Sequence, residues 1–151
     1  MSIQLKIRRG TAVQNDAFTG AEAELTYDTT SKGLRIHDGE TQGGHEVPVL
    51  IAVQRPTAEN GYTWYRKYSD GWVEQGGYYY KGSSVAGNNT ITLPVEMADT
   101  NYTVLSLIQF TAPGNAYVEV EVYPSRTTTS FVLGVPSADY GYNWEVKGMA
   151  A

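Results

Sequence analysis

Residues 62–75 have the sequence YTWYRKYSDGWVEQ, in which two aromatic-rich segments flank the dipeptide Asp70-Gly71. Asp-Gly is favoured in the tight turns of β-hairpins, because glycine tolerates the positive φ that the second turn position usually requires. Aromatic residues are also frequent in β-strands. The stretch therefore predicts an antiparallel hairpin, and with it a β-rich fold.

Short extended segments continue downstream of this hairpin. Counted with the two strands of the hairpin, about eight candidate strands follow one another at roughly 8–12-residue spacing, which is typical of an antiparallel sandwich or barrel. The loops between them are rich in Gly, Pro, Asn and Ser. Residues 103–110 are apolar on both faces of the expected strand, and this predicts that they form the central, most buried strand. We expect residues 61–151 to form a β-sandwich knob.

Upstream, residues 1–50 contain short alternating strands with few large side chains, and residues 11–20 could hold a short helical turn. Such a segment buries too little apolar surface to stand alone, because chains below about 40 residues usually need a disulfide, a metal or a partner. The chain has no cysteine. The partner is therefore expected to be another copy of the chain.

The boundary between these two parts is marked by turn and linker signals. Pro56 favours an extended conformation at the residue before it, and Asn60-Gly61 is a turn dipeptide. The predicted domains are residues 1–54 and residues 61–151, joined by a linker at 55–60.

Charge and hydropathy exclude two classes of partner. The net charge is −5 over 151 residues, with no basic patch in either half, so nucleic acid is not expected to bind. The longest apolar stretch, residues 47–53, is interrupted by Pro48 and is too short to span a bilayer. The N-terminus lacks the apolar region of a signal peptide. We expect no membrane insertion and no classical export signal.

Three stretches of the first part carry a resemblance to a known family. They are IQLKIRRGT at residues 3–11, AEAELTYDTT at residues 21–30, and KGLRIHDGET at residues 32–41. In this order they resemble the N-terminal module of phage tropism-determinant and tail-fibre proteins. The sequence departs from the family pattern at His37, where glycine is more frequent, and at Gly20-Ala21-Glu22, where the family has an adjacent Gly-Glu pair.

That resemblance implies an intertwined trimeric β-prism that joins a receptor-binding head to the virion. The residues that would trimerise are apolar positions of its short strands: Ile3, Leu5, Ile7, Leu25, Leu34 and Ile36. Residues 68–77, YSDGWVEQGG, together with Thr92-Leu93-Pro94, resemble the C-terminal knob of phage tail fibres. This second resemblance implies a knob that also trimerises and lies at the virion surface.

Two groups of residues could imitate a chemical site. Glu119 and Glu121 lie on one face of a predicted strand, at a separation that a glycosidase pair could have. A solvated strand face explains them better. A cluster of possible metal ligands comprises His37, Asp38, Glu40, His45 and Glu46. Its spacing matches none of the standard metal sites, although a metal on a threefold axis, with one His from each chain, stays open. We expect no catalytic residue, no metal and no cofactor.

The aromatic residues after the hairpin are the candidate receptor contacts. Tyr78, Tyr79 and Tyr80 are consecutive, and neighbours in a strand point to opposite faces. At least one ring is therefore expected to be exposed or covered by another chain. Together with the polar pair Asn88 and Asn89, these tyrosines are the predicted receptor-binding residues.

The sequence thus predicts an all-β homotrimer, with a short intertwined β-prism-like N-terminal segment and an antiparallel β-sandwich knob. The expected function is that of a non-enzymatic fibre protein on the virion surface of a tailed bacteriophage, made in the bacterial host cytoplasm. Its expected partners are other virion structural proteins and, through the knob, a host-surface glycan or protein. The alternatives are a capsid decoration or head-fibre protein without a receptor role and, third, a polysaccharide depolymerase.

Overall fold

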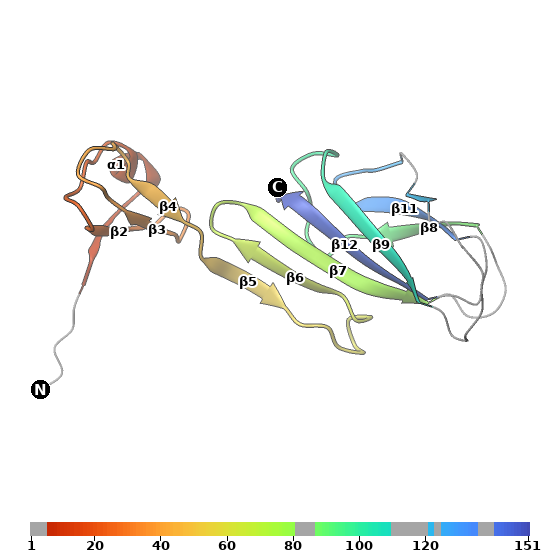
Figure 1. Ribbon diagram of the computed structural model, residues 1–151. Helices are drawn as coiled ribbons and strands as arrows, with labels where there is room; N and C mark the ends of the chain where they lie inside the picture. Colours follow the sequence, from red (N-terminus) through yellow and green to blue (C-terminus); the bar gives the residue numbers. More distant parts are fainter. Residues whose placement is uncertain (1–5, 81–86, 110–120, 123–124, 136–140) are drawn as a thin grey trace, which may run out of the picture. The chain divides into compact units, whose positions relative to one another are not determined.

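The computed structural model describes residues 6–80, 87–109, 121–122, 125–135 and 141–151 (Figure 1). Apart from one short helix, the regular structure of these residues is β-sheet, and nearly all strand pairs are antiparallel, as the sequence predicts. The chain divides into two compact units. Unit 1 is Met1–Ile51 with Tyr68–Asp70, and unit 2 is Ala52–Lys67 with Gly71–Ala151.

Unit 1 is built on a four-stranded sheet with the order β1-β2-β3-β4. The first pair is parallel and the other two are antiparallel. Helix α1 (Ala12–Asp16) begins with a capping box, in which Thr11 and Gln14 exchange side-chain to backbone hydrogen bonds. The strands are β1 (Arg8–Gly10), β2 (Leu25–Asp28), β3 (Leu34–Ile36) and β4 (His45–Val47).

The interior of unit 1 is polar. Among its described residues the fully buried large side chains are polar, and none belongs to the hydrophobic core. The Arg35 guanidinium donates to Asp16 Oδ1 at 2.7 Å and to Asp28 Oδ2 at 3.1 Å. Hydrogen bonds and ion pairs therefore take the place of an apolar core, as they must when polar groups are buried. The buried polar set is Asn15, Thr26, Asp28, Arg35 and His37.

Unit 2 carries two sheets. The larger has five strands in the order β5-β6-β7-β12-β9, and the smaller has three in the order β10-β11-β8. The predicted hairpin is confirmed: β6 and β7 pair antiparallel, and Gly71 at the turn has φ +89°. The strands of the larger sheet are β5 (Leu50–Gln54), β6 (Trp64–Tyr68), β7 (Trp72–Tyr80), β12 (Gly141–Met149) and β9 (Thr103–Gln109). Those of the smaller are β10 (Glu121–Val122), β11 (Ser130–Val135) and β8 (Gly87–Thr92).

The hydrophobic core of unit 2 draws side chains from both sheets. Phe131 of β11 meets Trp144 of β12 edge to face, with ring centroids 5.6 Å apart. Buried Gln75 is satisfied by the segment that follows β8, because its amide exchanges two hydrogen bonds with the backbone of Val95 at 2.8 and 2.9 Å. The core residues are Val73, Ile91, Leu93, Met97, Tyr102, Phe131, Leu133, Tyr142, Trp144 and Val146.

One strand prediction was wrong. Residues 103–110 are apolar on both faces, but β9 (Thr103–Gln109) is the last strand of the five-stranded sheet and not a central one. Its outward side chains are open to solvent, with Leu105 54% and Leu107 73% exposed. An apolar residue is not obliged to be buried in its own chain, so apolarity on both faces does not fix a strand at the centre of a sheet.

Candidate functional site

The predicted receptor residues do not form one surface: the tyrosines lie on β7 of the five-stranded sheet, and Asn88 and Asn89 lie on β8 of the three-stranded sheet. Tyr79 packs against the core of unit 2, and its hydroxyl donates to Asn89 Oδ1 at 3.0 Å. Asn89 is itself buried. These two side chains therefore link β7 to β8 inside the unit. Tyr78 lies on the opposite face of β7, and Asn88 is exposed on β8. The side chain of Tyr80 lies outside the described residues.

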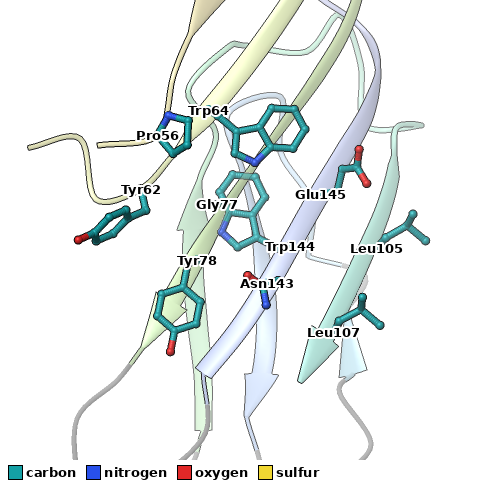
Figure 2. A pocket seen from close by; sticks show the side chains of 10 residues that line it. All are labelled: Pro56, Tyr62, Trp64, Gly77, Tyr78, Leu105, Leu107, Asn143, Trp144 and Glu145. Atoms are coloured by element: carbon teal, nitrogen blue, oxygen red, sulfur yellow. The ribbon is translucent and has the colours of Figure 1, made fainter. Parts of the chain in front are cut away.

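The face that carries Tyr78 is hollowed by a groove of about 740 Å³ (Figure 2). Ten residues line it, from β6, β7, β9, β12 and the connection before β6. Of the predicted site residues whose side chains the structure describes, Tyr78 alone lies in it. We call this feature the outer-face groove, and the residues that define its walls are Tyr62, Trp64, Tyr78, Leu105, Leu107 and Asn143.

Gly76 of β7 lies against Trp64, one of the residues that line this groove. The register places Gly76 of β7 opposite Trp64 of β6 and Glu145 of β12. A Cβ atom added at Gly76 would lie 2.7 Å from Trp64 Cζ2, so the indole ring lies directly against the glycine backbone. Any side chain at position 76 would displace Trp64. The glycine therefore sets the position of one aromatic wall.

The polar residues of the groove were not predicted as site residues, although the sequence contains the pattern that reveals them. Asn143 and Glu145 alternate along β12 with the buried residues Tyr142, Trp144 and Val146. Period-two alternation puts the two polar residues on the outer face. Figure 2 shows Asn143 between Tyr78 on one side and the two leucines of β9 on the other. What the sequence did not indicate is that β9 would lie beside β12.

The predicted trimerisation residues lie on the sheet of unit 1 where they are described. Ile7, Leu25 and Ile36 are each about two-fifths exposed, at 39%, 40% and 43%. Leu25 and Ile36 are direct register partners on β2 and β3, so their exposed apolar side chains lie together. Leu34 is half-buried. Ile3 and Leu5 lie outside the described residues, as does Glu119 of the carboxylate pair.

In the suspected metal cluster, the side chains of Asp38 and His45 pair with each other inside unit 1. The Asp38 carboxylate accepts hydrogen bonds from the Thr41 hydroxyl, the Thr41 and Glu40 N–H groups and His45 Nε2, at 2.6 to 3.0 Å. The Thr41 hydroxyl, with these other donors, lowers the pKa of Asp38. The described part of the chain brings together no group of three metal-ligating side chains.

His37, one of the two departures from the family pattern, is buried between backbone segments. Its Nδ1 accepts a hydrogen bond from the Gly20 N–H at 3.2 Å, and its Nε2 lies 3.1 Å from the Thr26 hydroxyl oxygen. The ring of Phe18 meets it edge-on. Both ring nitrogens are thus occupied within unit 1, and His37 stabilises that unit.

The nearby Asp28 carboxylate is the buried partner of Arg35. Burial opposes its ionisation, but the Ser31 and Thr30 N–H groups and Arg35 outweigh this and lower the pKa of Asp28. A fixed negative charge is therefore available to hold Arg35 inside the unit.

No helix in the described part of the chain is long and apolar enough to span a membrane.

Residues 5–41 match the family model described as the major tropism determinant N-terminal domain. Unit 1 thus carries a tropism-determinant-like domain. A "Tail fiber receptor-binding protein" of Bordetella phage BPP-1 is 46% identical over 44 residues, which are 29% of this chain and 12% of that protein. The similarity therefore reaches only a small part of the relative, and the chain spans about an eighth of the relative's length.

Two solved structures of pyocin fibres are also similar to the chain. An N-truncated R2-type pyocin tail fibre has a TM-score of 0.43 and 15% identity, over 66% of this chain and 39% of that one. A C-terminal fragment of the R2 pyocin fibre of P. aeruginosa has a TM-score of 0.40 and 16% identity, over 68% and 25%. Both TM-scores are low, so neither likeness assigns a function to unit 2.

Proposed function

We propose that the chain is a homotrimeric fibre protein on the virion surface of a tailed bacteriophage, and that it binds a host receptor through unit 2. The observation that carries this proposal is the tropism-determinant-like domain at residues 5–41, and the similarity of 44 residues of the chain to a phage tail-fibre receptor-binding protein supports it. The proposed partners are two further copies of the chain, other virion proteins and the receptor.

The interior of unit 1 supports the trimer. Its described residues bury polar groups, while Ile7, Leu25 and Ile36 stay exposed. Exposed apolar residues on a small sheet are stabilised when another copy covers them. We propose that residues 1–54 form the intertwined β-prism-like trimer, that residues 55–60 are a linker, and that residues 61–151 form the β-sandwich knob.

Receptor binding is tested best with the two predicted residues that face outward. Tyr78→Ala and Asn88→Ala in the virion protein are expected to reduce adsorption of particles to host cells and to leave the mass of the oligomer unchanged. Tyr79→Phe is the matched control. It removes the hydrogen bond to Asn89 inside the unit, at a stability cost of about 1 kcal/mol, and adsorption should be retained.

The outcome also separates the proposal from a capsid decoration protein. If the Tyr78 and Asn88 variants adsorb normally but their particles lose the protein or become fragile, the chain decorates the particle and does not bind a receptor. Labelled antibodies against the chain would then mark the capsid and not the tail.

A further inference from the structure

We propose that the outer-face groove binds a neutral saccharide. This inference rests on the proposed function, because it names the chemical class of the receptor and the surface of unit 2 that holds it. The volume of about 740 Å³ is within the range of small-molecule sites, which is roughly 300–1,000 Å³. The groove could thus hold a few sugar rings.

One wall of the groove is aromatic. Trp64 and Tyr78 come from neighbouring strands, and Tyr62 precedes β6 with 54% of its surface exposed. Tyr and Trp combine an apolar face with a polar edge, which suits ligands that are apolar on one side and hydroxylated on the other. A sugar ring has this character, because its C–H groups form an apolar face and its hydroxyls surround it.

Polar groups lie at the centre of the same surface. Asn143 is exposed between the aromatic wall and β9, and no hydrogen bond joins its carboxamide to another described residue. A carboxamide donates and accepts at once, and so does a sugar hydroxyl. A few polar groups inside a mainly apolar lining are what orient a small ligand in its site.

The charge of the groove favours a neutral ligand. Its lining contains one charged side chain, Glu145, whose carboxylate lies 3.1 Å from Lys147 Nζ. The Glu145 carboxylate can still accept hydrogen bonds from neutral hydroxyls, and the described lining holds no cationic side chain to pair with a uronic or other acidic sugar. The chain as a whole also carries a net charge of −5.

A second copy of the chain is the competing occupant, because Leu105 and Leu107 are exposed on the β9 side. The centres of interfaces between copies are depleted of charged residues, however, and burying Asn143 against an apolar partner surface would leave its carboxamide unpaired. A hydroxylated ligand pairs with this carboxamide and still covers the aromatic wall.

The test is a calorimetric titration of the full chain with neutral gluco-, manno- and galacto-oligosaccharides, with an oligouronate of similar length as the charged comparison. At least one neutral probe is expected to bind with a Kd of about 1 mM or lower, and the oligouronate to bind at least about tenfold more weakly. The proposal is overturned if none of the neutral probes binds at about 10 mM, or if the oligouronate binds equally well.

Variants locate the binding. Tyr62→Ala and Asn143→Ala each change an exposed side chain, and each is expected to weaken binding at least about tenfold, a loss of roughly 1.4 kcal/mol. Trp72→Ala is the matched control, because Trp72 is an exposed aromatic residue of β7 that does not line the groove. Equal affinity of all three variants would show that the saccharide does not bind there.

A last measurement separates this proposal from the function on which it rests. If Leu107→Glu lowers the mass of the oligomer while no saccharide binds, the groove is a contact between copies and the proposal is wrong. If the protein binds no saccharide but still competes with particles for adsorption to host cells, receptor binding stands and the saccharide proposal alone is lost.

Discussion

His37 shows how one side chain can determine the packing of unit 1. The imidazole lies between two glycines, and a Cβ atom added at Gly20 would lie 2.6 Å from His37 Cγ, while one added at Gly44 would lie 2.7 Å from His37 Nδ1. Position 37 can therefore hold a large ring only because positions 20 and 44 hold no side chain. The two departures from the family pattern, at His37 and at Gly20-Ala21-Glu22, meet at this contact.

Gly20→Ala is accordingly expected to destabilise the protein by about 1–3 kcal/mol, the usual cost of overpacking a filled interior. Chemical denaturation followed by circular dichroism measures the change. The neighbouring substitution Ala21→Ser, at an exposed position, should stay within about 0.5 kcal/mol of the parent. Equal stability of Gly20→Ala and the parent would mean that His37 is free to move aside.

Asp38 predicts a dependence of stability on pH. Its donors, the Thr41 hydroxyl first, lower its pKa in the folded state below the unfolded value of about 3.9. A carboxyl group with a lowered pKa stabilises the fold fully above the unfolded pKa, and this contribution is lost as the pH falls toward the folded pKa. The difference in Tm between the parent and Asp38→Asn should therefore be largest near neutral pH and shrink below about pH 4. A difference that is constant between pH 7 and pH 3 contradicts this account.

The β6–β7 hairpin illustrates which elements a sequence can predict. Its signal is local, because Asp70-Gly71 fixes the turn and the aromatic residues around it favour strands. The burial of β9 was mispredicted because it depends on which strands lie beside it, and no residue within 103–110 carries that information. The outer-face groove was missed for the same reason. Tyr78 was predicted, but Asn143 and Leu107 join it only through the pairing of β12 with β7 and β9.

The hairpin turn itself can be tested with two substitutions at Gly71, which has φ +89°. Gly71→Val is expected to cost about 1–2 kcal/mol, because a β-branched residue is strained at positive φ. Gly71→Asn is the matched comparison. It also adds a Cβ atom near Met149 Cε, but asparagine tolerates positive φ better, so its cost should be smaller. Equal thermal unfolding of the two variants would exclude backbone strain as the cause.

The two units bury different kinds of side chain, and this difference supports the proposed assembly of the whole molecule. The described part of unit 2 has a hydrophobic core of ten residues, whereas that of unit 1 is held together by buried polar groups around Arg35 and His37. Marginal domains gain most from association with another copy. The sequence predicted that residues 1–50 require association with another copy, since they hold few large side chains. It did not reveal that buried polar side chains, joined by hydrogen bonds, would form the interior in place of apolar ones.

The interface itself is tested by adding charge. Leu25→Lys and Ile36→Lys, at two exposed positions that are direct register partners, are expected to reduce the mass of the oligomer, because a buried lysine without a partner costs several kcal/mol. Val13→Lys is the control, because Val13 is 78% exposed on α1 and is not among the predicted trimerisation residues. If all three variants keep the parental mass, β2 and β3 do not form the contact between copies.

The mass of the full chain in solution tests the central proposal of a homotrimeric fibre protein most directly. Multi-angle light scattering at micromolar concentration should give three times the chain mass of 16.6 kDa. A mass of one chain under these conditions would contradict the trimer, and with it the proposed role of unit 1 in assembling the fibre.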